Sequence, residues 1–224
     1  MSVVVPWVPE DGRTDAWAWL RARWEALYPA WELIEVPAPP VRFNAAQAVN
    51  DGVARSTGDV IVVAYADTLV DDRWVLQAVG EVGTGGAAVV APEVVGYLGR
   101  FESADVLKSA PDNAVAIPVD GPLVEYRSTG WPGAAVASRD HLTEFPFDEA
   151  FRGAAYEGDA WLLASGLLGG RVARYGHTLH LWHPTTPERT WGAREAEGNR
   201  ELYDRYVKAD ADGMRILVKR STRQ

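Results

Sequence analysis

The chain has 224 residues, of which 47% are hydrophobic and 24% charged, and its formal net charge is −9. This composition is typical of one globular domain with a sizeable core, and the acidic balance argues against broad, sequence-independent binding to nucleic acid, which needs lysine and arginine. The absence of cysteine excludes disulfides and thiolate metal sites, so any metal must be bound by carboxylate, imidazole or substrate oxygen atoms.

The N-terminal segment MSVVVPWVPEDG lacks the basic region and the long apolar region of a signal peptide. No uninterrupted apolar run reaches the length of a membrane span. We therefore expect a cytoplasmic protein without a membrane span.

Strands and helices alternate in the first 95 residues, judged by apolar runs and by apolar residues at helical spacing. The predicted strands are residues 2–5, 31–36, 59–66 and 87–95. The predicted helices are residues 14–29, capped by Thr14 or Asp15, 43–58, capped near Asn44 and ended by Gly58, and 71–82. This alternation is typical of a parallel sheet covered by helices, in which ligands bind beyond the carboxyl ends of the strands.

The second half is less regular, and residues 96–130 give no assignment. The pattern predicts a short strand within 132–142 that runs into a helix capped by Ser138, and a helix over 156–168. Residues 171–176 and 177–184 resemble strands, and residues 193–210 form an amphipathic closing helix.

Asp67 directly follows the third predicted strand. In one interpretation it is a turn or cap residue of the helix that follows. In the other it is an oxygen ligand for Mg²⁺ or Mn²⁺, which commonly use only one or two carboxylates together with substrate phosphates and water. The second interpretation requires another protein ligand from elsewhere in the chain.

The segment GHTLHLWHP contains three of the four histidines. In a continuous strand, His177 and His183 share a face and His180 points to the other. We therefore expect a single metal-facing histidine rather than a three-histidine site, and the alternative is structural imidazoles on a strand edge.

Three further polar residues have both an ordinary and a functional interpretation. Glu157 and Asp159 open a predicted helix, where the helix dipole favours acids, or they take a proton from an acceptor hydroxyl or hold it by hydrogen bonds. Arg189, in a loop after the histidines, is either solvated or binds a diphosphate through paired donors. The motifs of P-loop, dinucleotide-binding and serine-hydrolase proteins are absent from the sequence.

These segments, in this order, resemble a GT-A glycosyltransferase of the family 2 type, as found in small bacterial and actinophage proteins. The matching stretches are SVVVPW, FNAAQAVNDGVARSTGDVIVVAYADTLV, PGAAVASRDHLTEFPFDEAFRGAAYEGDAW, HLWHP and NRELYDRY. The third stretch is similar to a galactosyltransferase-type C-terminal module. The resemblance implies an α/β fold with a Rossmann-like, mostly parallel sheet flanked by helices and a smaller mixed C-terminal half.

The same resemblance implies one catalytic domain, residues 1–210, followed by a tail, residues 211–224. Residues 1–95 would be the nucleotide-binding half and residues 96–210 the acceptor and metal half. The implied activity is transfer of a sugar from a nucleoside-diphosphate sugar, a UDP-sugar by expectation, with Mn²⁺ or Mg²⁺. The acceptor is not identified and is a glycan, a protein or a modified nucleotide.

The family pattern also implies roles for single residues. Asp67 matches the metal-binding second aspartate of the D-x-D motif, and His183 matches the late histidine of the metal site. Glu157 matches the glutamate of the E-D pair near the acceptor. The expected donor-binding residues are Pro6, Trp7, Glu35, Tyr65 and Arg189.

Two positions depart from that pattern. Tyr65 stands where the first aspartate of D-x-D is expected, and Gly158 stands at the second position of the E-D pair, where inverting relatives keep the catalytic base. Asp159, one residue later, is the candidate to replace that base. The departures favour the alternative of a nucleotide-sugar-binding or pseudo-glycosyltransferase protein. A nucleotidyltransferase would need a glycine-rich basic loop after the first strand, where only Arg13 is basic.

Overall fold

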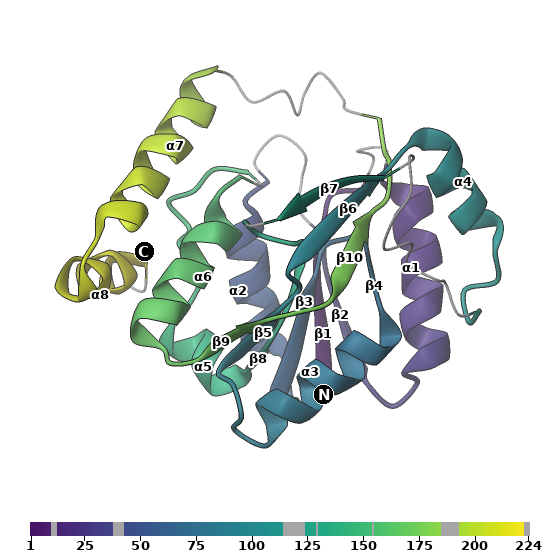
Figure 1. The fold of residues 1–224 in the computed structure, drawn as a ribbon, viewed down its shortest axis with the longest axis horizontal. Helices are drawn as coiled ribbons and strands as arrows, with labels where there is room; N and C mark the ends of the chain where they lie inside the picture. The colour runs from purple at the N-terminus through teal and green to yellow at the C-terminus, as the bar shows by residue number, and fades with distance from the viewer. Residues whose placement is uncertain are drawn as a thin grey trace.

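The computed structural model of the protein describes residues 1–9, 13–37, 43–113, 124–128, 130–153, 155–184 and 193–221. Its central sheet has six strands in the order β2-β1-β3-β8-β5-β9 (Figure 1). Their bounds are β1 (Ser2–Trp7), β2 (Glu32–Pro37), β3 (Val60–Ala64), β5 (Val89–Ala91), β8 (Ala134–Ser138) and β9 (Val172–Arg174). The predicted α/β fold with a mostly parallel sheet is confirmed: the β1–β2, β1–β3 and β5–β9 pairs are parallel, and β8 makes the sheet mixed by running antiparallel to both of its neighbours.

A second sheet has four strands in the order β4-β10-β6-β7. Their bounds are β4 (Thr68–Val70), β6 (Val94–Leu98), β7 (Val124–Ser128) and β10 (His177–His180). The single strand predicted over 87–95 is wrong: the run divides into β5 of the central sheet and β6 of the second sheet. Pro92 lies between them and has no backbone N–H to donate to a ladder, which suits a break at this point.

Eight helices are present in the described part of the chain. Their bounds are α1 (Thr14–Leu27), α2 (Ala45–Arg55), α3 (Asp72–Gly83), α4 (Arg100–Lys108), α5 (Arg139–Glu144), α6 (Glu157–Leu168), α7 (Ala193–Lys208) and α8 (Ala211–Ser221). Two predicted caps are confirmed: Asn44 Oδ1 accepts from Gln47 N at 3.1 Å, and Ser138 Oγ accepts from His141 N at 3.1 Å. The cap predicted at Thr14 or Asp15 is wrong, because α1 begins after Arg13 with no side-chain cap, and α2 ends at Arg55 rather than at Gly58.

Helices cover both faces of the central sheet. Successive side chains of a strand point to opposite faces, and in β1 both sets are apolar, so each face needs helices to bury it. Val3 and Val5 of β1 belong to the core cluster that contains the buried residues of α1 and α3. Val4 belongs to the other cluster, with α2 and with Trp161 of α6. The alternation seen along β1 therefore fixes which helices lie on which side.

Within the segment predicted as a C-terminal tail, Ala211–Ser221 form α8. Met214 and Val218, one helical turn apart, are buried with Phe151 and Tyr206 in a third apolar cluster. None of the described helices combines the length and the apolar character that crossing a bilayer requires.

Candidate metal and nucleotide site

Asp67 lies in the turn between β3 and β4, at the carboxyl end of β3. Its side chain is buried, and its backbone carbonyl accepts from Leu181 N at 2.8 Å, which ties this turn to the residue after β10. The helix cap is a different residue: Asp71 Oδ1 accepts from Arg73 N at 2.9 Å and Trp74 N at 3.0 Å. The interpretation of Asp67 as the cap of α3 is therefore wrong.

Two imidazoles face the Asp67 carboxylate. Oδ2 of Asp67 is 3.5 Å from Nε2 of His183 and 3.6 Å from Nε2 of His180. One potential ligand atom from each of these three residues lies within 4.8 Å of the other two. The expectation that His180 would point away from His183 is wrong, because β10 ends at His180 and the strand alternation does not extend to His183. His177 is not part of this group of described residues.

Arg13 forms an ion pair with the same carboxylate, from Nε to Oδ2 of Asp67. Burial opposes ionisation of Asp67, but the Arg13 guanidinium and the two imidazoles outweigh it and lower the pKa of Asp67 to about 2. Burial, with the nearby Arg13 charge, also lowers the pKa of His183. At neutral pH the site therefore holds an ionised carboxylate and at least one neutral imidazole, which is the protonation state that metal binding needs.

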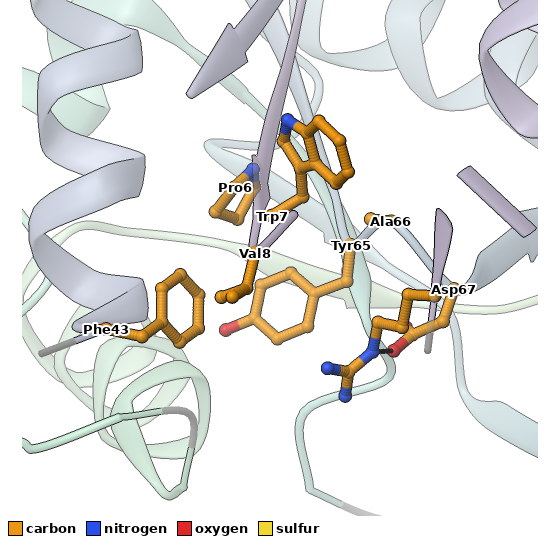
Figure 2. Close-up of a pocket in the computed structure, with 8 residues that line it drawn as sticks. Pro6, Trp7, Val8, Phe43, Tyr65, Ala66 and Asp67 are labelled. Atoms are coloured by element: carbon orange, nitrogen blue, oxygen red, sulfur yellow. Dashed lines mark hydrogen bonds and ion pairs between the residues drawn. The ribbon is translucent and has the colours of Figure 1, made fainter. Parts of the chain in front are cut away.

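Tyr65 precedes Asp67 by two residues, and Figure 2 shows its phenol pointing toward Phe43 and away from the Asp67 carboxylate. Its hydroxyl donates to Oε1 of Glu157, at the start of α6. Burial raises the pKa of Glu157 to about 7, against the opposing effect of the hydrogen bond from Tyr65. The other carboxylate oxygen of Glu157, Oε2, is buried and has no hydrogen-bond partner among the described residues.

The two departures from the family pattern meet at one side chain, Trp131. The rings of Tyr65 and Trp131 have centroids 5.7 Å apart, and a Cβ at Gly158 would lie 2.2 Å from a ring atom of Trp131. The indole thus fills the space that a side chain at position 158 would need. Asp159 is half-buried and accepts a hydrogen bond from the backbone of Trp131. Burial raises the pKa of Asp159, whereas this hydrogen bond and the charge of Arg174 lower it.

Two cavities meet at Asp67. The larger, of about 200 Å³, is lined by strands β4, β6 and β10 of the second sheet and by adjoining loops, and its lining includes Trp131 and His180. The smaller, of about 20 Å³, includes Pro6, Trp7 and Phe43 (Figure 2). Arg13, Tyr65 and Asp67 line both cavities.

Of the expected donor-binding residues, Glu35 and Arg189 are not among the described residues that line these cavities. Glu35 on β2 lines neither cavity; its Oε2 accepts from Trp17 Nε1 at 2.9 Å. The ring of Trp17 has its centroid 6.3 Å from that of Trp7, so Glu35 reaches the smaller cavity only through two indoles. Arg189 lies outside the described residues.

The potential ligand atoms of Asp67, His180 and His183 fit a divalent ion. A buried, ionised carboxylate and two imidazoles with mutually close ligand atoms suit Mn²⁺ better than Mg²⁺, because Mg²⁺ prefers an all-oxygen octahedral shell. Sequence reasoning missed three of the residues that build this site: Arg13, Trp131 and His180. The signal available for Arg13 was that it is the first basic residue after β1, at the sheet edge where Asp67 lies.

Comparison with known proteins gives a match to one family model. Residues 11–113 match the family model of Glycosyl transferase family 2, and this stretch includes β3, Asp67 and Arg13. No curated protein sequence matches the chain. The first part of the chain therefore carries the pattern of this glycosyltransferase family.

The chain is also similar in structure to glucosyl-3-phosphoglycerate synthase from Mycobacterium tuberculosis. The crystal structure of that enzyme with phosphoglyceric acid gives a TM-score of 0.55 at 20% identity, covering 93% of this chain and 80% of that chain. Its complex with Mg²⁺ and uridine diphosphate gives 0.54 at 19% identity, and its complex with Mn²⁺, UDP-glucose and phosphoglyceric acid also gives 0.54 at 19%, both with the same coverage of 93% and 80%. At this identity the likeness shows a shared GT-A-like fold.

Proposed function

We propose that this chain is a metal-dependent glycosyltransferase of family 2 that moves a sugar from a nucleoside-diphosphate sugar to an acceptor. The observation that carries the proposal is the group formed by Asp67, His180 and His183 at the edge of a GT-A-like sheet, on a cavity of about 200 Å³. The family match over residues 11–113 supports the reaction class. The M. tuberculosis enzyme was crystallised with UDP-glucose and Mn²⁺, so these are the first donor and metal to test.

Asp67, His180 and His183 would hold the divalent ion, which when bound would neutralise charge on the leaving diphosphate. Pro6 and Trp7 line the small cavity next to Asp67, and we assign the nucleotide to this side of the site. Residues 1–95 then contribute the nucleotide contacts and the carboxylate, and residues 96–210 contribute both histidines and the acceptor side. Arg189 remains a candidate for the diphosphate, and Glu35 for the base or ribose.

Glu157 and Asp159 are the proposed acid–base groups. Glu157 is the better suited of the two, because one of its carboxylate oxygens has no partner in the described part of the chain and its pKa is about 7. A group that exchanges its proton near the working pH is suited to proton transfer with an acceptor hydroxyl. Tyr65 orients this carboxylate through its hydrogen bond to Oε1, which gives the unusual tyrosine a positioning role.

A binding protein without turnover is the second candidate. It is favoured by Trp131, whose ring occupies the space that a side chain at position 158, the second position of the E-D pair, would need. Such a protein would bind the nucleotide sugar and the metal in the same way. It would not release the sugar.

Thermal unfolding with UDP, GDP and UDP-glucose, each with and without Mn²⁺, tests donor binding. We expect UDP and Mn²⁺ together to raise the Tm of the wild type, and Asp67→Asn to remove the metal-dependent part of this shift. Asp71→Asn is the matched control: asparagine still caps α3, so the baseline Tm should change little and the ligand-induced shift should stay intact. Stabilisation by none of the nucleotides would refute the proposal.

Hydrolysis of UDP-glucose then separates the enzyme from the binding protein. For the enzyme we expect slow, Mn²⁺-dependent release of glucose by the wild type and its loss in Asp67→Asn. Donor binding without any release, in the presence of Mn²⁺, would favour the binding protein. Equal release with and without metal, in both proteins, would contradict the assigned metal site.

A further inference from the structure

Three groups converge on one oxygen of Asp67. Oδ2 is bound by Nε of Arg13 and is faced by Nε2 of His183 at 3.5 Å and Nε2 of His180 at 3.6 Å. The Arg13 contact is the closest of the three. The side chains of Asp67 and Arg13 are 4% and 16% exposed, so this ion pair is largely shielded from water. The guanidinium therefore lies where an ion bound to Oδ2 would have to approach.

A guanidinium and a divalent ion do not share a buried carboxylate oxygen without strong repulsion, because charges in a weakly screened interior interact at several times their strength in water. Arginine does not escape this repulsion by losing its proton. The imidazoles, in contrast, are ligands when neutral. A metal bound through Oδ2, the oxygen that both imidazoles face, thus requires Arg13 to leave that oxygen.

The Arg13 guanidinium can also point into the cavities that it lines. It lines the large cavity and the small one, together with Tyr65 and Asp67. Its backbone is held at the start of α1, where its carbonyl accepts from Trp17 N at 2.8 Å, so a change of side-chain rotamer is enough to move the guanidinium. A diphosphate between the two cavities would offer it the paired oxygen acceptors that guanidinium binds best.

We propose that Arg13 is a built-in counter-ion of Asp67 that the divalent ion displaces and that the diphosphate of the donor then receives, so that metal and nucleoside diphosphate bind cooperatively. This inference rests on the proposed function and specifies how its two ligands are coupled. Without nucleotide, Arg13 competes with the metal for Oδ2. With nucleotide, Arg13 is held elsewhere and adds to donor binding, so each ligand tightens the other by the same factor.

Titration of the full-length protein with Mn²⁺, with free Mn²⁺ measured by electron paramagnetic resonance, tests this coupling with and without UDP. For the wild type we expect UDP to tighten Mn²⁺ binding about tenfold. For Arg13→Gln we expect Mn²⁺ without UDP to bind about tenfold more tightly than to the wild type. We expect UDP to tighten Mn²⁺ binding less than it does in the wild type, because only the direct contact between metal and diphosphate is left. A purely structural role for Arg13 predicts the opposite sign, since loss of a structural ion pair does not improve a metal site.

Two control variants make the result specific. Arg13→Lys keeps the positive charge and is expected to retain most of the competition. Arg13→Met, which keeps an unbranched side chain without the charge, replaces the glutamine variant if that variant does not fold. Arg73→Gln removes an exposed arginine from the first turn of α3 and the same unit of net charge, and it should bind Mn²⁺ as the wild type does.

The outcomes separate this inference from the proposed function. Mn²⁺ binding that depends on Asp67 but is equal or weaker in Arg13→Gln overturns the role of Arg13 and leaves the metal site standing. Absence of Mn²⁺ binding in every variant, even with UDP, overturns both. Tighter Mn²⁺ binding in Arg73→Gln as well would reduce the effect to net charge and would also overturn the role of Arg13.

Discussion

A tyrosine in place of the first aspartate of D-x-D changes the electrostatics of this sheet edge. A second carboxylate two residues before Asp67 would add negative charge beside the metal, whereas the Tyr65 hydroxyl is neutral: burial, followed by the nearby Glu157 carboxyl, raises its pKa well above the ordinary value. The phenol donates its proton to Glu157 instead. Tyr65 therefore links the turn that carries Asp67 to the start of α6, which are the proposed metal side and the proposed acceptor side of the site.

The raised pKa of Glu157 gives a prediction for stability. Its folded pKa is about 7, against an ordinary value of 4.5, so the folded protein binds more protons than the unfolded chain between these values. The stability contributed by protonated Glu157 is complete below pH 4.5 and is lost as the pH rises through 7. Glu157→Gln stays neutral and avoids this loss. We expect its unfolding free energy, relative to the wild type, to rise by about 2 kcal/mol between pH 5 and pH 8.

Urea unfolding of both proteins at the two pH values measures this difference. Glu144→Gln, at the exposed end of α5, serves as the control and should show a constant difference from the wild type. A difference for Glu157→Gln that is the same at both pH values would show that Glu157 is ionised throughout.

The site residues divide into those that a sequence can suggest and those that it cannot. Asp67 was predictable because it ends a strand of an alternating α/β pattern, where ligands bind. His180 was missed because the alternation of a strand was extended past its last residue. Trp131 and Arg13 lie in loops, where no periodicity predicts which way a side chain points.

At the scale of the element, the start of α6 is the unusual feature. Tyr156, the residue before the helix, has a φ of 70° and provides no side-chain cap. The first two helical residues, Glu157 and Gly158, are buried, which is uncommon for a helix terminus. This burial brings the Glu157 carboxylate within hydrogen-bonding distance of the Tyr65 hydroxyl. A glycine at 158 lets the helix backbone pass directly beneath the indole of Trp131.

Gly158 and Gly166 form a matched pair within α6. A Cβ at Gly166 meets only a methyl group of Val172 at 3.8 Å, so Gly166→Ala should gain up to about 1 kcal/mol of stability from helix propensity. A Cβ at Gly158 would lie 2.2 Å from the Trp131 ring, so Gly158→Ala should lose about 1–3 kcal/mol. Thermal unfolding and tryptophan fluorescence measure both variants, and an equal gain in both would place Trp131 away from the helix.

The elements themselves were predicted unevenly, for physical reasons. Long amphipathic helices such as α1 and α2 carry several turns of apolar spacing and are found from sequence alone. Strand β4 has three residues, too few to show a periodic pattern, so the sequence did not predict it. The apolar run over 87–95 looked like one strand because apolar character does not record which sheet each part joins.

At the scale of the whole molecule, the site exists because two sheets meet. Asp67 lies where β3 of the central sheet passes into β4 of the second sheet, and β10 pairs antiparallel with β4, which brings His180 opposite Thr68. This contact joins positions more than a hundred residues apart. Local patterns predict β10 but neither β4 nor the pairing of the two strands. Only the family resemblance therefore connected the aspartate with a histidine.

The C-terminal helix gives the last prediction, because it decides whether residues 211–221 belong to the folded domain. Met214 is 1% exposed and lies in the cluster with Tyr206 of α7, whereas Ile216 on the same helix is 62% exposed. Met214→Ala should therefore cost about 2–4 kcal/mol through lost burial and the cavity left behind. Ile216→Ala should change the unfolding free energy by less than about 0.5 kcal/mol, as surface substitutions generally do. Urea unfolding followed by circular dichroism compares the two. If this segment were a tail, both variants would match the wild type, and a large loss confined to Met214→Ala means that α8 unfolds together with the core.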